Sequence, residues 1–289
     1  MRKNKFTFVA VYVTASIALF IGGCSSSDDN STNSTNSSEI ESSSRNNSEN
    51  SSENTSENDT TLNQEGNVTW EYDTTTCTLT LSGSGDMSEY NIYDYPWEQD
   101  GKYAKKLVIK EGITAIGSNA FSGFTYLDEV ILPNSLKSIQ SQSFSRCSSL
   151  KTINIPDNVT AIGQLAFSQC VSLEEIVIPS NVTKIQDYTF NECSSLKTVT
   201  LPDNLEKIYD YAFAHCTALT EVTLPNNLVS LTEGVFSGCT SLTKVIIPET
   251  VKTMHNYIFY DCPNVTLYVK KDSMAESYAE NNDIAFLSE

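Results

Sequence analysis

From residue 105 onward, apolar and polar positions follow a pattern with a period of 23, the interval from Cys147 to Cys170. Each unit contains a short alternating run such as Ile153-x-Ile155, which predicts a strand with one face turned inward. A proline ends this run by removing the next backbone donor, and a second extended piece follows. An Ala-Phe pair then closes the unit. One unit therefore predicts two extended pieces and one short helical turn.

Four residue types recur in fixed columns of this repeat. The columns contain Cys147, Cys170, Cys193, Cys216, Cys239 and Cys262; Pro133, Pro156, Pro179, Pro202, Pro225 and Pro248; Phe121, Phe144, Phe167, Phe190, Phe213, Phe236 and Phe259; and Leu150, Leu173, Leu196, Leu219 and Leu242. A single unit cannot bury its apolar side alone, whereas stacked units share one core. The sequence therefore predicts a repeat solenoid.

A polar residue precedes the Ala-Phe turn in each of the later units. This position is occupied by Asp187, Asp210, Glu233 and Asn256. Asp and Asn are good N-cap residues, so we expect one helical turn to begin at this position.

The motif Leu-x-x-Ile-x-Ile-Pro…Ile-Gly…Ala-Phe…Cys over residues 105–268 resembles the BspA-like, or treponemal-type, leucine-rich repeat. The resemblance implies a leucine-rich repeat array of about seven units. Residues 66–104, which include "VTWEYDTTTCTLTLSGSGDM" and Pro96-Trp97, are similar to the β-rich N-terminal cap that often precedes such arrays. Residues 269–289 resemble their small C-terminal cap. This family is associated with adhesion to proteins and host surfaces.

The first residues combine a positively charged start with an apolar run over residues 6–21, which is too short and too broken by threonine to span a bilayer comfortably. The run ends in Ile21-Gly22-Gly23-Cys24, which resembles a bacterial lipobox, where the cysteine thiol accepts diacylglycerol. We therefore expect a lipoprotein signal peptide over residues 1–23 and a lipid on Cys24, with the domain displayed on the bacterial cell surface. The alternative is an ordinary signal peptide with an incidental cysteine.

Residues 24–65, which follow the signal peptide, are composed of Ser, Asn, Thr and Glu with almost no apolar side chains, so we expect a disordered tether. The whole chain has 36 acidic and 18 basic side chains, a net charge of -18. This balance argues against nucleic acid as a partner, because phosphate binding requires clustered Lys and Arg. It also argues against adhesion to anionic lipid, so the membrane is expected to hold the protein only through its lipid anchor.

The cysteine column is expected to form a ladder, because a column of one repeat places equivalent side chains about 4.8 Å apart. In such a ladder a thiol packs as a small hydrophobe with a weak donor. Disulfides between neighbouring turns would also require suitable Cβ vectors, and a zinc site would require a tetrahedron rather than a row. We favour buried free thiols over both alternatives. Cys77 lies outside the repeat.

Residues that could carry catalysis are few. The chain has two histidines, His215 and His255, and neither a phosphate-binding glycine loop nor a nucleophile elbow. Glu175 and Glu221 would lie about 9.6 Å apart, within the range of an inverting glycosidase pair. Thr198 between them instead favours a spacing that keeps like charges off adjacent turns. We expect no enzyme activity, cofactor or metal.

One side of the predicted strands is left open to a partner. We define the strand face as the outward side chains of these strands: Glu129, Ile131, Thr152, Asn154, Glu175, Val177, Thr198, Thr200, Glu221, Thr223, Lys244 and Ile246. Solenoids use extended concave surfaces for binding, and we expect an extracellular protein, from host matrix or another cell surface, as the partner. The alternative is a surface glycan bound by Tyr188, Tyr211 and Tyr257, which could otherwise simply cover the turn.

The predicted lipid on Cys24 can be tested by detergent-phase partitioning of the native protein. The wild type should enter the detergent phase because of its acyl chains, and Cys24→Ala should remain in the aqueous phase. If both proteins remain in the aqueous phase, the anchor prediction is wrong.

Overall fold

The computed structural model describes residues 63–65, 67–91 and 94–289. The predicted signal peptide, Cys24 and most of the predicted tether lie outside the described residues. The last three tether residues, Asn63–Glu65, form strand β1, which pairs with the strand that follows it. Within the described ranges, no helix has the length and apolar character needed to cross a bilayer.

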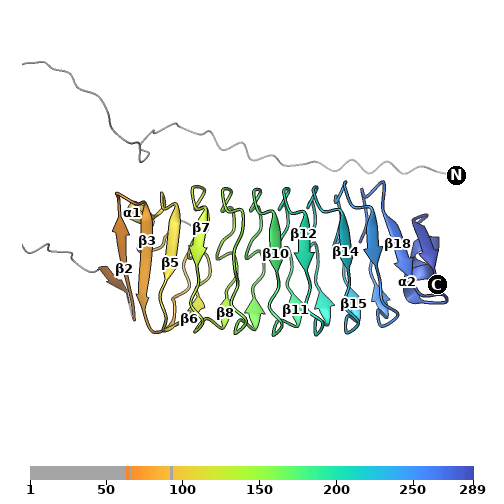
Figure 1. Ribbon diagram of the computed structural model, residues 1–289, viewed down its shortest axis with the longest axis horizontal. Coiled ribbons are helices and arrows are strands. Elements are labelled where there is room, and N and C mark those ends of the chain that lie inside the picture. Colours follow the sequence, from red (N-terminus) through yellow and green to blue (C-terminus); the bar gives the residue numbers. More distant parts are fainter. Residues whose placement is uncertain (1–62, 66, 92–93) are drawn as a thin grey trace, which may run out of the picture. The chain divides into compact units, whose positions relative to one another are not determined.

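A first row of strands runs along one side of the repeat array (Figure 1). It comprises β1 (Asn63–Glu65), β2 (Val68–Asp73), β3 (Thr78–Gly83), β5 (Lys106–Ile109), β7 (Glu129–Ile131), β10 (Glu175–Val177), β12 (Thr198–Thr200), β14 (Glu221–Thr223), β16 (Lys244–Ile246), β18 (Thr266–Val269) and β19 (Ala285–Ser288). The first three strands pair antiparallel, and β3 pairs parallel with β5. In the repeats the pairing is parallel and joins equivalent positions of successive units, such as Glu175 and Thr198. The sequence repeat is therefore one turn of the solenoid. The run Ile153-x-Ile155, which was predicted as a strand, forms none, so the row is interrupted between β7 and β10.

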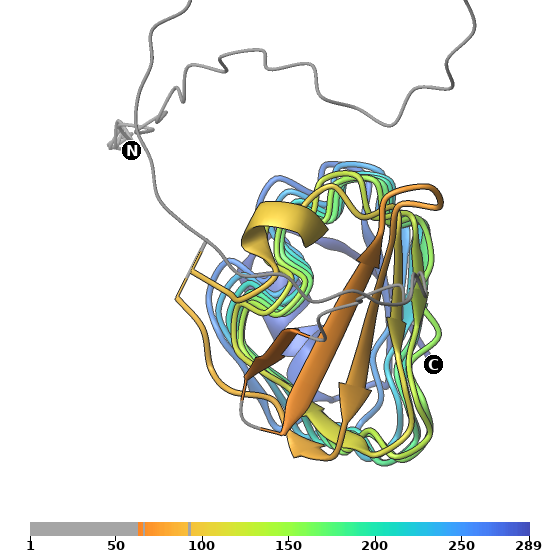
Figure 2. The ribbon, with the colours of Figure 1, turned by 90° about the vertical axis from the view of Figure 1, so that its left-hand side faces the viewer.

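A second row of shorter parallel strands forms another side (Figure 1). It comprises β4 (Gly85–Asp86), β6 (Ile113–Ile116), β8 (Ser138–Ile139), β9 (Ala161–Ile162), β11 (Lys184–Ile185), β13 (Lys207–Ile208), β15 (Ser230–Leu231) and β17 (Thr253–Met254). Successive turns follow a nearly straight line in Figure 1 and superpose closely along the array in Figure 2. The first row is accordingly flat in these two views, whereas the sequence predicted a concave surface.

The third side of each turn is a run of tight turns, and the expected helical turn does not form. Two positions per unit have a positive φ, for example 58° at Gln142 and 63° at Arg146. An α-helix needs φ near −63°, so these left-handed residues interrupt it. The expected N-cap carboxylates have another role, since Asp187 accepts from the backbone N–H of Asp210 in the next turn (3.0 Å). The described helices, α1 (Glu98–Gly101) and α2 (Met274–Asn281), lie outside the repeats.

The phenylalanine column forms a continuous stack of buried rings through the core. Neighbouring rings from Phe121 to Phe259 have centroids 5.3 to 5.8 Å apart, and those of Phe167 and Phe190 are parallel within 1°. Offset stacking of this kind adds to the free energy gained by burying each ring. The stack therefore links every turn to the next.

Aromatic residues cover both ends of this stack. At the N-terminal end, Trp97 stacks on Phe121 at 5.6 Å, and its indole Nε1–H donates to the carbonyl oxygen of Ala120 (3.0 Å). At the C-terminal end, Tyr278 from α2 meets Phe259 edge-on at 6.3 Å. The Tyr278 hydroxyl accepts from the backbone N–H of Ile258 (3.2 Å). Each cap thus combines an aromatic contact with a hydrogen bond to a terminal turn.

The six cysteines of the repeat lie in the core beside this stack, buried and with free thiols. Each thiol donates to the carbonyl oxygen of the phenylalanine in the preceding turn, as Cys193 does to Phe167 (3.2 Å). Burial raises the pKa of every ladder thiol, and that of Cys170 rises to about 12. The thiols are therefore protonated donors that connect adjacent turns.

Replacing Cys193 by Ser should lower the free energy of unfolding by about 1–3 kcal/mol, because a buried hydroxyl costs more to desolvate than a thiol. Cys193→Ala is the matched control and should lose less, because it buries no polar group. Urea unfolding of the three proteins measures the difference. An equal or larger loss in the alanine variant would contradict the packing of this thiol as a small apolar group and would instead assign its contribution to the hydrogen bond with Phe167.

Raised thiol pKa values also predict a loss of stability in alkali. An unfolded thiol ionises near its usual pKa of 9, whereas Cys170 keeps its proton up to about pH 12 in the fold. The unfolded state therefore binds fewer protons between these values, and stability falls as pH rises through them. From about pH 8 to about pH 10, the wild type should lose more unfolding free energy than Cys170→Ala. Parallel pH curves for the two proteins would show that this thiol does not contribute.

Candidate functional site

The strand face is the largest set of predicted site residues that the fold brings together. The alternation of side chains along a strand determines which residues belong to this face. Ile176 points into the core, while Glu175 and Val177 on either side of it point outward. Of its twelve residues, eleven are exposed and Lys244 is half-buried. The face therefore remains open along the repeats.

Ion pairs between adjacent turns neutralise two of the three carboxylates on this face. Lys106 lies 2.8 Å from Glu129 at one end, and Lys244 lies 3.6 Å from Glu221 at the other. Glu175 faces Thr198 and takes part in no ion pair among the described residues. Among the carboxylates of the strand face, Glu175 is therefore the one without an ion pair in the described residues.

In four successive turns the residue before the strand face alternates in charge, and one close ion pair forms in this column of Asp128, Lys151, Glu174 and Lys197. The ammonium of Lys197 lies 2.6 Å from the carboxylate of Glu174, and this hydrogen bond lowers the pKa of Glu174. Both side chains are well exposed, so the pair contributes little to stability. It leaves Glu175, next to Glu174 in the chain, as the carboxylate available to a partner.

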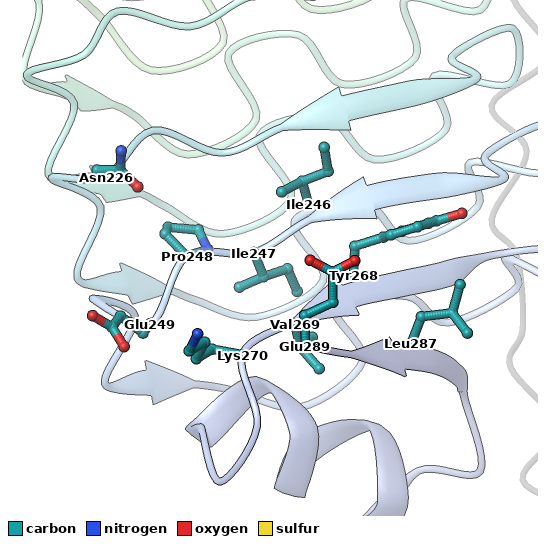
Figure 3. A pocket seen from close by; sticks show the side chains of 10 residues that line it. All are labelled: Asn226, Ile246, Ile247, Pro248, Glu249, Tyr268, Val269, Lys270, Leu287 and Glu289. Carbon is teal, nitrogen blue, oxygen red and sulfur yellow. The ribbon is translucent and has the colours of Figure 1, made fainter.

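Apolar side chains on the open side of the first row concentrate at its C-terminal end. Ile246 on β16, Tyr268 on β18 and Leu287 on β19 are in register, with 37%, 36% and 54% of their surface exposed. They line a groove of about 350 Å³ (Figure 3). Val177, by contrast, is 61% exposed with Asn154 and Thr200 in the adjacent turns. The face thus has an isolated central valine and a continuous apolar group at one end.

Tyr268 and Leu287 were missed by counting along the repeat. The interval from Ile246 to Tyr268 falls short of the repeat period, and the interval from Tyr268 to Leu287 is shorter still, so counting by the period does not reach them. A usable signal was the alternation in Thr266–Val269, where Leu267 and Val269 are buried and Tyr268 is exposed. Strand alternation therefore locates outward residues where the repeat length changes.

Residues 91–220 and 162–280 match the family described as the BspA type leucine rich repeat region, in six copies. The chain belongs to the BspA-type leucine-rich repeat family.

A solved structure shares the fold, and a second is less similar. A leucine-rich repeat protein of T. pallidum is 25% identical, with a TM-score of 0.50 over 60% of this chain and 86% of that chain. A leucine-rich repeat protein of Bacteroides ovatus is 22% identical, with a TM-score of 0.41 over 71% of this chain and 70% of that chain. Among curated proteins, none matches this BspA-type chain. The similarities therefore concern the repeat architecture.

The tyrosine column of the BspA-type array does not form a continuous platform for sugars. Tyr188 and Tyr211 stack on each other at 5.2 Å and 13°, so each covers a face of the other. The Tyr211 hydroxyl donates to Glu233 (2.9 Å), and burial together with this bond raises the pKa of Tyr211 to about 12. The next turn has Gly234 at this position, so the stack ends there. A Cβ on Gly234 would lie 2.3 Å from the Tyr211 ring, which leaves no room for a side chain. Tyr188 and Tyr211 thus largely cover the turn.

Tyr257 differs from the stacked pair. It is 58% exposed and meets Tyr260, which is 65% exposed, at 6.0 Å and 87°. Both are on the turn side of the array, away from the strand face. Among the tyrosines in and beside the predicted column, this pair keeps the most exposed rings for a glycan.

The two histidines are separate from one another and from the strand face. His215 is exposed, and its ring lies over Gly238, where a Cβ would come within 2.4 Å of Nδ1. His255 is also exposed and begins the turn that carries Tyr257. In the part of the chain that the structure describes, no three His, Cys, Asp or Glu side chains gather as metal ligands would.

Proposed function

We propose that this BspA-type array is a non-enzymatic module on the bacterial cell surface that binds an extracellular protein through its strand face. The observation that carries the proposal is the exposure of eleven of the twelve strand-face residues along parallel strands. An uncovered surface of this kind can receive a partner without any rearrangement of the array.

The chemistry of the strand face suits a close protein contact. Its central residues are short or uncharged, with Thr152, Asn154, Thr198 and Thr200 around Val177. The six turns of the strand face, about 4.8 Å apart, place the first and last about 24 Å from one another, a length that suits a protein interface. Glu175 carries the unpaired charge at its centre, so the partner should present basic groups.

The proposed location follows from the N-terminal sequence. A lipid on Cys24 would attach the protein to the membrane, and residues 25–62, which precede strand β1, would hold the array away from it. A flexible coil of this length spans about 35 Å, and its acidic side chains would extend it further. A protein of the host matrix or of another cell surface would be within its reach.

A surface glycan is the second candidate partner, and the exposed pair Tyr257 and Tyr260 favours it. Aromatic rings bind sugars through their flat faces, and in this edge-to-face pair the edge of one ring meets at most one face of the other, so the remaining faces are open. This surface lies on the turn side, so substitutions separate the two candidates.

A pull-down against extracellular matrix proteins, run beside a glycan array, tests the proposal. Glu175→Lys combined with Val177→Lys should abolish protein binding, because it reverses the free charge and removes the apolar contact. The matched control is Glu206→Lys with Val229→Lys, which makes the same changes at exposed positions near the second row. Circular dichroism and melting temperature should be unchanged in both variants.

Equal binding of the extracellular protein by the strand-face variant and by the control variant would contradict the proposal. Loss of glycan binding in Tyr257→Ala with Tyr260→Ala, with the strand-face variant unaffected, would establish the glycan instead.

A further inference from the structure

The C-terminal end of the first strand row holds a groove that the repeat pattern does not predict. Ile246, Tyr268 and Leu287 lie side by side across β16, β18 and β19 (Figure 3). The groove beside them is about 350 Å³, large enough for one or two amino-acid side chains. Three adjacent apolar side chains on an open sheet mark a contact surface more strongly than the single Val177 does.

The Tyr268 ring is arranged to pack against an aliphatic or aromatic side chain rather than under a sugar. The ammonium of Lys244 lies 5.5 Å from the ring centroid and occupies one face. Figure 3 shows the ring edge-on, between Ile246 on one side and Leu287 on the other. A stacked sugar would need a free ring face, whereas an inserted side chain can use the edge together with its aliphatic neighbours.

The charged residues of the groove favour a basic occupant. Its lining includes the carboxylates of Glu249 and Glu289 and the ammonium of Lys270. Neither carboxylate belongs to an ion pair among the described residues, and Lys244 is already paired with Glu221. Two unpaired carboxylates therefore face one ammonium, in a chain whose net charge is -18. Charge complementarity thus favours Lys or Arg in the partner.

We propose that this groove binds an extended segment of the partner protein, with an apolar side chain against Ile246, Tyr268 and Leu287 and an adjacent Lys or Arg at Glu249 and Glu289. The proposal deepens the proposed function and rests on it. It assigns the main anchor to the C-terminal groove, whereas the sequence pattern favoured the surroundings of Val177.

A phage-displayed library of random linear peptides, selected on the full chain, is the probe. Recovered peptides should combine a large apolar residue with a neighbouring Lys or Arg. As synthetic capped peptides, they should bind Tyr268→Ser with Leu287→Ser about tenfold or more weakly than the wild type, as expected for an interface anchor. Glu249→Gln with Glu289→Gln should weaken binding and reduce its dependence on salt.

The matched control is Val171→Ser with Val229→Ser, which removes two exposed apolar side chains that belong neither to the strand face nor to the groove. It should bind the peptides as the wild type does. Leu287→Ser alone guards against misfolding, because that side chain is more than half exposed and its variant should melt like the wild type.

Three results would overturn the groove proposal. These are a failure to enrich any peptide, equal binding to the groove variant and the wild type, and binding of a glycan rather than a peptide in the groove. A fourth is a loss of peptide binding in Ile131→Ser with Val177→Ser while the groove variant still binds the peptides. That last result would leave the strand-face function intact, so the two proposals can fail separately.

Discussion

One stacked phenylalanine per turn is the constraint on which the rest of the array depends. Rings from Phe121 to Phe259 must remain 5.3 to 5.8 Å apart, so every turn must return the chain to the same place. The thiol of each ladder cysteine hydrogen-bonds to the phenylalanine carbonyl oxygen of the turn before it, which links the same two turns a second time. An insertion in one turn would break both contacts, and this accounts for the constant length of the repeat.

The same constraint explains which parts of the structure could be predicted from sequence. Most strand positions, the inward residues and the cysteine ladder follow from side-chain alternation and from the spacing of the columns, although Ile153-x-Ile155 has the same alternation and forms no strand. The prediction of a helical turn was wrong for two reasons. An Asp before an apolar pair fits an N-cap, and residues with a positive φ such as Gln142 and Arg146 have no distinctive sequence signature. The orientation of Tyr188 against Tyr211 also depends on the ring geometry of two neighbouring turns, which a column of letters does not specify.

The ends of the solenoid are where the repeat stops constraining the chain. An uncapped end would expose the last ring and the edge of each strand row. Trp97 and Tyr278 cover the terminal rings, and both come from segments that lack the period of the repeat. At the N-terminal end the row continues into the antiparallel strands β1 to β3. The caps are thus part of the same core, built from different sequence.

The end of the repeat also explains the position of the C-terminal groove. Within the stack, each outward side chain lies beside equivalent positions fixed by the turns on both sides, and the central positions are mostly small or polar. Beyond Phe259 no further phenylalanine has to be placed, and the interval from Ile246 to Tyr268 falls short of the repeat period. Tyr268 and Leu287 are therefore free of the packing that fixes the repeats. Departures from an otherwise consistent pattern are where functional residues are expected, and here that departure places three exposed apolar side chains next to one another on the open strand row.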